Sequence, residues 1–236
     1  MIGLKPLLAV AVAVSRLVAA HPFSHDIQDR QVDASVVPVA DPVVVDAGGV
    51  YMRTTTLGDG SILGGYTGFD GPTQILRVTK STDGGASWSI IGSVDSGPSA
   101  TREIDNAFPL ALPDGRILYA FRNHDKVPGG GYQHYRITVC VSEDGGVTWS
   151  FLSHIDERAP NGRNGLWEPF LRIARDGAIQ AYYSAENSDG DQDNIMRAST
   201  DGGRTWSGIY GMTGGDVNSR DGMIGIANID TNGNLM

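Results

Sequence analysis

The sequence of 236 residues contains a single cysteine, Cys140. No intrachain disulfide is therefore possible, and the fold has to rely on packing. Basic residues are also few, because 18 Lys and Arg stand against 27 Asp and Glu, and the formal net charge is −9. Binding to nucleic acid or to an anionic membrane requires clustered Lys and Arg. The charge balance argues against both partners and suits a neutral ligand.

Motifs for metals and cofactors are missing as well. The five histidines show no metal-ligand spacing, and neither a GxGxxG nor a P-loop pattern occurs. We therefore expect no metal and no cofactor. After residue 45 the sequence has no long amphipathic helical pattern, whereas short alternating runs such as residues 136–141 are frequent. Together with 32 Gly and 11 Pro, these runs predict an all-β domain that is rich in turns.

The N-terminus has the features of a secretory signal peptide. Lys5 precedes an apolar stretch at residues 7–14, and Val18-Ala19-Ala20 offers a small-residue cleavage site. Arg16 interrupts the apolar run, and a membrane span needs ~20 apolar residues. We expect a signal peptide at residues 1–20, a polar leader at residues 21–40 and a secreted, extracellular protein.

One short motif occurs three times, as Ser-x-Asp-Gly-Gly-x-[Ser/Thr]-Trp at residues 81–88, 142–149 and 199–206. Its aspartates, Asp83, Asp144 and Asp201, lie 61 and then 57 positions apart. A period of this kind indicates an array of similar units. Asp accepts hydrogen bonds from nearby backbone N–H groups, and Gly-Gly supplies the positive φ angles of a tight turn. We interpret the motif as a structural hairpin turn, with ligand binding by the three aspartates as the alternative.

A second repeat places Asp-Gly or Asn-Gly between apolar runs, at residues 57–63, 112–118, 174–180 and 230–236. This dipeptide between apolar runs is the strongest short signal for a hairpin. Each unit then has four antiparallel strands in about 60 residues, which is typical of a β-propeller blade. We predict an all-β propeller domain at residues 41–236, with about three and a fraction four-stranded blades.

The carboxylate with the most informative surroundings is Glu168, in the apolar and aromatic segment at residues 165–172. An unpaired charge is costly to bury, and such surroundings can tune a carboxyl group for nucleophilic or acid/base chemistry. Glu168 is therefore a candidate catalytic residue. The alternative is a Glu that is paired with Arg163 or Arg172 at the edge of a sheet.

These motifs resemble those of known proteins. The Ser-x-Asp-x-Gly-x-x-Trp motif is similar to the Asp box of sialidase-type propellers, which joins the third and fourth strands of a blade. Residues 165–171, residues 180–187 and Ser-Arg-Asp-Gly-Met at 219–223 resemble fungal exo-α-1,5-L-arabinanases of glycoside hydrolase family 93. The resemblance runs from about residue 40 to the end. It implies a secreted, six-bladed, monomeric propeller that releases arabinobiose from linear arabinan, a neutral plant cell-wall polysaccharide, with retention of configuration.

The resemblance also implies that Glu168 is one of two catalytic carboxylates. We assign it as the nucleophile, with the reversed role as the alternative. A retaining glycosidase needs two carboxyl groups ~5–5.5 Å apart, and the family's second Glu follows the strand that begins at residues 234–236. Since the sequence stops there, we expect a C-terminally truncated chain whose ring of blades is not closed. We expect this chain alone to be inactive.

Eight further residues are candidates for substrate binding: Arg53, Asp105, Asn106, Trp167, Glu186, Asn187, Arg220 and Asp221. We expect Arg53 on the first strand of the first unit, with Asp105 and Asn106 at the equivalent place in the second. Arg220 and Asp221 are expected at the place in the fourth unit that Glu168 has in the third. Trp167 could stack on a sugar ring. Glu186 and Asn187 follow a predicted second strand, as does the polar run at residues 122–125, which we interpret as a solvent-exposed loop face.

Two other functions remain open. A sialidase would carry an early Phe/Tyr-Arg-Ile-Pro motif, and here residues 51–54 lack the Ile-Pro. The Trp-Glu-Pro segment at residues 167–169 favours the arabinanase. The second alternative is a propeller that binds carbohydrate or protein without catalysis.

Overall fold

The computed structural model describes residues 41–160 and 165–227. The predicted signal peptide, the leader up to residue 40 and the fourth Asn-Gly repeat lie outside these residues. The described strands belong to one compact unit, which begins at Pro42. This part of the chain is built from strands and turns. None of its segments forms an apolar helix of membrane-spanning length.

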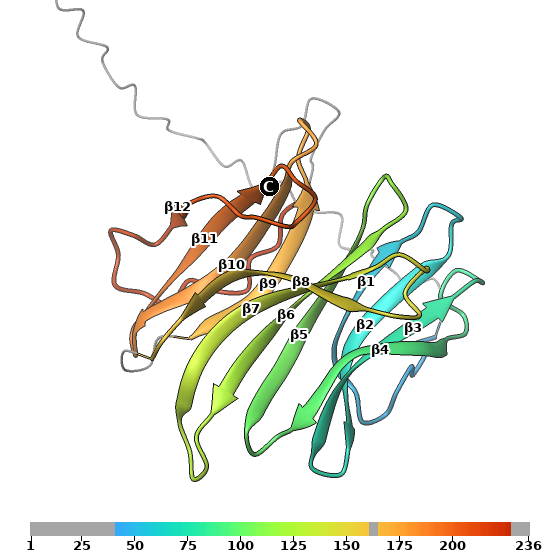
Figure 1. The fold of residues 1–236 in the computed structure, drawn as a ribbon, viewed down its shortest axis with the longest axis horizontal. Helices are drawn as coiled ribbons and strands as arrows, with labels where there is room; N and C mark the ends of the chain where they lie inside the picture. The colour runs from blue at the N-terminus through green and yellow to red at the C-terminus, as the bar shows by residue number, and fades with distance from the viewer. Residues whose placement is uncertain (1–40, 161–164, 228–236) are drawn as a thin grey trace, which may run out of the picture. The chain divides into compact units, whose positions relative to one another are not determined.

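Twelve strands of the described residues form three four-stranded antiparallel sheets (Figure 1). The first sheet holds β1 (Val50–Thr56), β2 (Ile62–Asp70), β3 (Thr73–Ser81) and β4 (Ser89–Pro98). The second holds β5 (Arg102–Ala111), β6 (Ile117–Lys126), β7 (Tyr132–Ser142) and β8 (Ser150–Arg158). The third holds β9 (Leu166–Ile173), β10 (Ile179–Ser188), β11 (Asp191–Ser199) and β12 (Tyr210–Thr213). Strands that follow one another in sequence are neighbours in each sheet, which confirms the predicted blade pattern.

The Asp-Gly repeats close the hairpins between the first two strands of each sheet. In the first hairpin the Leu57 amide donates to the Ser61 carbonyl at 2.8 Å, and the Gly60 amide donates to the Leu57 carbonyl at 3.0 Å. The same two bonds recur at both later repeats. The glycines Gly60, Gly115 and Gly177 have φ values of 82°, 90° and 85°. Only glycine adopts this conformation at little cost, so the dipeptide fixes the turn.

The Ser-x-Asp-Gly-Gly motif of the second sheet joins β7 to β8. Asp144 Oδ1 accepts hydrogen bonds from Ser142 Oγ at 2.8 Å and from the Thr148 amide at 2.9 Å, and Asp144 Oδ2 accepts one from Thr148 Oγ1. Ser142 Oγ accepts a bond from the Gly146 amide at 2.9 Å, and Trp149 Nε1 donates to the Gly146 carbonyl at 3.0 Å. The hydrogen bonds from Thr148 and Ser142 lower the pKa of Asp144 to about 2. This aspartate closes a turn, as the structural interpretation predicts.

The apolar core lies in two seams between neighbouring sheets, because the faces of each sheet pack against the next sheet. The first seam joins the first and second sheets through Leu63, Leu76, Val78, Ile104, Ala107, Ile117, Tyr119, Phe121 and Cys140. The second joins the second and third sheets through a larger set that includes Leu118, Tyr135, Ile137, Val139, Leu166, Leu171, Ala181 and Tyr183. Burial raises the pKa of the Cys140 thiol to about 12, so this cysteine is an unreactive packing residue.

The outer part of the first seam is tight enough to require a glycine. A Cβ atom on Gly92 in β4 would lie 2.5 Å from the Val147 carbonyl oxygen and 3.1 Å from the Gly146 carbonyl oxygen. Both oxygens belong to the backbone of the Asp144 turn in the next sheet. The repeated turn therefore serves two purposes, since it closes its own hairpin and forms a surface for the preceding sheet.

Replacing Asp144 by Ala should lower the melting temperature, because the Thr148 amide and both hydroxyl groups would lose their acceptor. Thermal unfolding monitored by circular dichroism measures this effect. The matched control is Glu143→Ala, which removes the adjacent exposed carboxylate. Equal melting temperatures for the two variants would contradict the structural role of the motif.

Gly92→Ala should destabilise the protein by about 1–3 kcal/mol, as expected for an overpacked contact against rigid backbone. Gly211→Ala is the control, since a Cβ at Gly211 in β12 would meet no atom within 4 Å. Urea unfolding of both variants measures the difference. A Gly92→Ala variant that is as stable as the control would show that the seam can widen.

Candidate functional site

The inner strand of each sheet is interrupted by a β-bulge at the same place. In all three sheets two residues of the inner strand lie opposite a single residue of the second strand. The opposed residues are aromatic and buried. The pairs are Tyr51-Met52 opposite Tyr66, Asn106-Ala107 opposite Phe121, and Glu168-Pro169 opposite Tyr183. Pro169 is tolerated because the inner strand is an edge strand, where its missing N–H breaks no ladder bond.

The first residue of each bulge has a left-handed backbone. The φ values are 56° at Tyr51, 54° at Asn106 and 53° at Glu168, and Met223 in the segment after β12 has 58°. Among the described residues these four are the only ones other than glycine with positive φ. Such a conformation is costly for Tyr, Glu and Met. Strain of this kind persists where the surrounding structure enforces it, and it clusters at functional sites.

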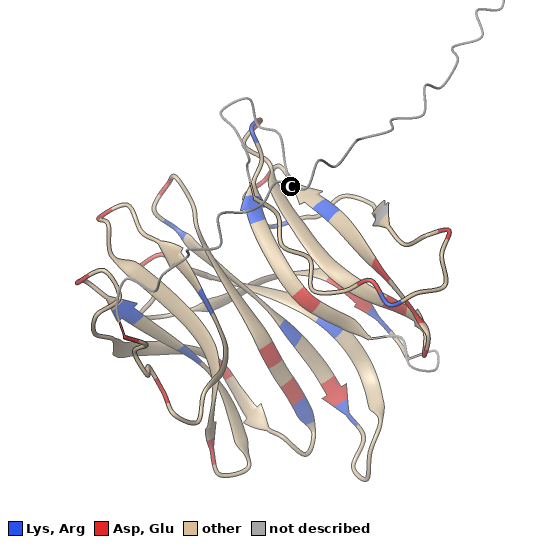
Figure 2. Ribbon diagram, turned by 180° about the vertical axis from the view of Figure 1, so that it is seen from behind, with Lys and Arg blue, Asp and Glu red and all other residues tan. Residues whose placement is uncertain are grey.

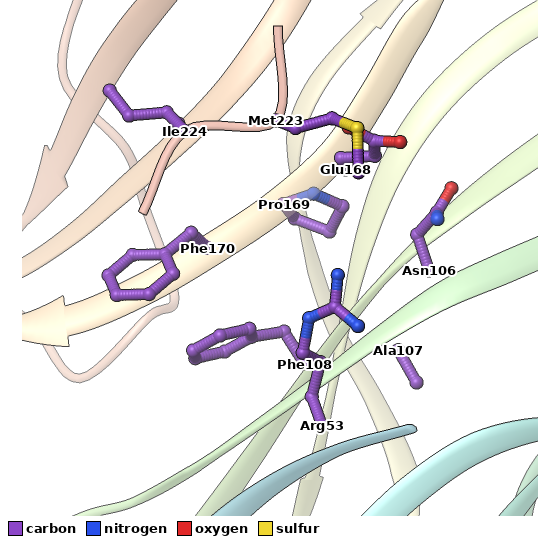
Figure 3. A pocket seen from close by; sticks show the side chains of 9 residues that line it. All are labelled: Arg53, Asn106, Ala107, Phe108, Glu168, Pro169, Phe170, Met223 and Ile224. Carbon is purple, nitrogen blue, oxygen red and sulfur yellow. The ribbon is translucent and has the colours of Figure 1, made fainter. Parts of the chain in front are cut away.

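The bulges of the second and third sheets and the segment at Met223 border a cavity of about 70 Å³ (Figure 3). Its lining residues are Arg53, Asn106, Ala107, Phe108, Glu168, Pro169, Phe170, Met223 and Ile224. Figure 3 shows the polar ends of Arg53, Asn106 and Glu168 on one side and the rings of Phe108 and Phe170 on the other. The two ring centroids lie 4.7 Å apart. The cavity therefore combines a polar wall with an aromatic one, as carbohydrate sites do.

Glu168 is the only carboxylate among the described residues that line the cavity. Burial raises the pKa of this carboxyl group, and the nearby charges of Arg122 and Arg53 act in the opposite direction. Asp105 adds to the increase by repulsion. The carboxylate is thus held in a partly dry site, where two guanidinium groups favour its ionised form.

Arg53 and Asn106 lie on the same cavity as Glu168, although the sequence places them in other sheets. Arg53 is exposed toward the cavity, and its Nη1 donates only a long bond of 3.3 Å, to the Met52 carbonyl. Asn106 is 6% exposed, and its Oδ1 has no hydrogen-bond partner among the described residues. An unpaired buried acceptor is unfavourable, so Asn106 Oδ1 is a free hydrogen-bond acceptor beside the cavity.

Two of the predicted residues lie directly behind the cavity instead of lining it. Asp105 is buried, accepts a bond from Thr67 Oγ1 at 2.7 Å and lies 3.3 Å from Arg122 Nη2. The Trp167 ring packs against the side chain of Arg122, whose guanidinium carbon is 4.7 Å from the ring centroid. Each precedes the left-handed residue of its bulge, so both are placed to support it.

The remaining four predicted residues form a separate polar cluster beside the third sheet. Glu186 in β10 is buried and accepts bonds from the Gly165 amide at 3.0 Å and from Arg220 Nη2 at 2.6 Å. Asn187 donates to Asp191 and Asp193, and the Asp221 amide donates to the Gln192 carbonyl. In the fourth unit it is Met223 that shares the left-handed backbone of Glu168, while Arg220 and Asp221 lie three and two residues earlier. The cluster holds this segment against the third sheet.

The interpretation of residues 122–125 as a solvent-exposed loop face is wrong. These residues belong to β6, and Asn123 and His124 are buried. His124 Nε2 donates to the Leu166 carbonyl at 2.9 Å across the second seam, and its ring packs against Tyr135 and Trp167. Burial is the main cause that lowers the pKa of His124 to about 3. A polar run is buried here because each member finds a partner in the fold, which the sequence does not reveal.

Acidic and basic positions lie side by side on strands in the middle of the unit, and many other acidic positions lie in turns (Figure 2). In the part of the chain that the structure describes, no group of three or more His, Cys, Asp or Glu side chains is arranged to hold a metal ion. Glu168, Arg53 and Asn106 are the polar side chains among the described residues that line the cavity.

Repeated Asp-box turns, four-stranded sheets and bulged inner strands define a β-propeller of the Asp-box class. The sequence profile of the family described as BNR repeat-like domain matches residues 60–222. The chain belongs to this family. No curated protein matches the chain at a significant level.

Solved structures confirm the fold and the resemblance seen in the sequence. The α-L-arabinanase of Penicillium chrysogenum, solved with arabinobiose, matches at 24% identity and a TM-score of 0.58, over 70% of this chain and 49% of that chain. The family 93 α-L-arabinofuranosidase of Fusarium graminearum, also solved with arabinobiose, matches at 25% identity and a TM-score of 0.60, over 76% of this chain and 53% of that chain. The described part is a partial propeller, and the chain spans about half the length of these proteins.

The buried His124 should make stability depend on pH. Its pKa of about 3 lies below the unfolded value near 6.5, so its contribution is complete above pH 6.5 and is lost as pH falls toward 3. We expect His124→Gln, which keeps an N–H donor for the Leu166 carbonyl, to lose a smaller part of its stability between pH 7 and 4. Urea unfolding at several pH values measures the slope. His134→Gln, which removes a more exposed imidazole of the same sheet, should behave like the unaltered protein, and parallel slopes for all three proteins would contradict this role.

Proposed function

We propose that the protein is a secreted glycoside hydrolase that acts in exo fashion on α-1,5-linked L-arabinan with retention of configuration. The observation that carries the proposal is the placement of Glu168. Its carboxylate lies on a strained bulge of an inner strand and is directed into a cavity that also holds a free guanidinium group and an unpaired amide oxygen. The arabinobiose complexes of the two solved relatives support a neutral pentose substrate.

In the proposed reaction Glu168 is the nucleophile that attacks the anomeric carbon. Arg122 and Arg53 favour the ionised carboxylate that this role requires, against the effect of burial. The Arg53 guanidinium and the Asn106 amide contact hydroxyl groups of the sugar. The rings of Phe108 and Phe170 form the apolar wall that the C–H face of the sugar contacts.

A retaining reaction needs a second carboxyl group ~5–5.5 Å from the first, to act as acid and base. No other described residue on the cavity provides one. By the family resemblance, we expect this group outside the described residues. We therefore propose that the described cavity binds arabinobiose and that hydrolysis of arabinan requires the second carboxyl group to complete the site.

Where the second carboxyl group completes the site, Glu168→Gln should reduce kcat for the release of arabinobiose from linear arabinan by at least ~10²-fold, since a positioned catalytic carboxyl group contributes ~10²–10⁴. The products are measured by anion-exchange chromatography. Glu157→Gln is the control, because Glu157 is an exposed carboxylate that pairs with His134 away from the cavity.

Each alternative function gives a different result in the same assay. Release of sialic acid with no release of arabinobiose would establish a sialidase. Tight binding of arabinan with no hydrolysis, even with the second carboxyl group present, would establish a binding propeller. Full activity of Glu168→Gln would overturn the catalytic role of this residue.

A further inference from the structure

Arg122 occupies a position between the two bulges of the second seam. It comes from β6 of the second sheet, and its side chain is 14% exposed. Its Nη2 lies 2.7 Å from Glu103 Oε1 and 3.3 Å from Asp105 Oδ2. Its guanidinium carbon lies 4.7 Å from the centre of the Trp167 ring in the third sheet. One guanidinium group therefore contacts two carboxylates on one sheet and an aromatic face on the next.

Two of the residues that Arg122 contacts are the immediate neighbours of bulge residues. Asp105 precedes Asn106, and Trp167 precedes Glu168. Asp105 Oδ1 also accepts a hydrogen bond from the backbone amide of Asn106 at 2.7 Å. Arg122 fixes Asp105 relative to Trp167. It thereby fixes the distance and direction between the Asn106 side-chain amide and the Glu168 carboxylate.

We propose that Arg122 is a positioning residue that, through Asp105 and Trp167, holds the Glu168 carboxylate in place against the second sheet. The inference rests on the proposed function, in which Glu168 is catalytic. Arg122 is not among the residues that line the cavity, so it acts through Trp167 and Glu168 and not through the substrate. A planar guanidinium suits this place, because it can bind a carboxylate at its edge and stack on an indole with its face.

The charges around Glu168 predict in which direction its pKa changes when Arg122 is replaced. Arg122 from β6 and Arg53 from β1 lower the pKa of Glu168, while burial and Asp105 from β5 raise it. Removing the charge of Arg122 should raise the pKa further. Glu103 pairs with Arg122. Removing the charge of Glu103 should leave the positive charge of Arg122 less compensated, and this should lower the pKa of Glu168.

The test is an NMR titration of the Glu168 side chain in the 236-residue protein labelled with ¹³C-glutamate, with the signal assigned by its loss in Glu168→Gln. For Arg122→Met we expect the midpoint to rise by about half a unit to one unit, because a neighbouring Arg typically shifts a carboxyl group by about 1–3 units and this site is partly solvated. Arg122→Lys, which keeps the charge but not the stacking, should show a smaller change. Glu103→Gln should move the midpoint in the opposite direction.

The matched control is Arg197→Met. Arg197 in β11 pairs with Asp156 at 2.9 Å across the same seam and is 20% exposed, but it lies outside the Glu168 surroundings. This variant should lose stability and leave the Glu168 midpoint unchanged. Equal midpoints for Arg122→Met and Arg197→Met, or shifts of the same sign for Arg122→Met and Glu103→Gln, would overturn the proposal. If Arg122→Met does not fold, the Glu168 midpoints of Glu103→Gln and Arg197→Met are compared. A lower midpoint in Glu103→Gln than in Arg197→Met supports the proposal, and equal midpoints overturn it.

A second measurement separates this proposal from the proposed function. Where the second carboxyl group completes the site, Arg122→Met should lower kcat for arabinan about tenfold or more with little change in KM, and the acidic limb of the pH profile should move to higher pH. If Glu168→Gln is fully active, the proposed function fails while the titration result can still stand. If Glu168→Gln is inactive and Arg122→Met has normal kcat and an unmoved acidic limb, the positioning role fails alone.

Discussion

The left-handed bulge on each inner strand is the constraint on which the site depends. A strand at the edge of a sheet can break its ladder at small cost, because one side of its backbone has no partner strand. The extra residue of the bulge lies opposite a buried aromatic ring, which keeps the sheet packed while the inner strand changes direction. Glu168 therefore leaves the regular alternation of its strand, and its carboxylate reaches the cavity instead of the seam.

The second constraint is electrostatic. A carboxylate in a partly dry cavity requires nearby positive charge, and a positive charge in a seam requires its own partners. The second seam meets both requirements with one connected set, in which Glu103 and Asp105 hold Arg122 and the charge of Arg122 counteracts the rise in the pKa of Glu168. His124 lies in the same seam and stays neutral, so it adds a hydrogen bond to the Leu166 carbonyl without adding a further charge. Stability of the seam and tuning of the site depend on the same residues.

The sequence predicted those features that local chemistry determines. The turns follow from Asp-Gly and Ser-x-Asp-Gly-Gly, whose hydrogen bonds join residues at most four positions apart, and Glu168 stood out because its neighbours are apolar. The bulges could not be predicted in this way, since Tyr, Glu and Met do not favour a left-handed backbone and adopt it only under tertiary packing. Each bulge adds one residue to its strand, so a strand pattern that omits this residue assigns the neighbouring side chains to the wrong positions. For this reason Arg220 and Asp221 were expected where Met223 lies, and Phe108 and Phe170 were not recognised as lining residues.

Four left-handed positions, three of them in bulges, show how one repeated fold can present different side chains on the same backbone. The backbone is nearly the same at Tyr51, Asn106, Glu168 and Met223, yet the side chains are a phenol, an amide, a carboxylate and a thioether. Asn106, Glu168 and Met223 line the same cavity, whereas Tyr51 lines a second cavity together with Met52 and Tyr66. The Asp-box turns and hairpins of the three sheets are held by their own hydrogen bonds. A change of side chain at Asn106 or Glu168 therefore alters the lining of the cavity without altering the turns that hold the sheets together.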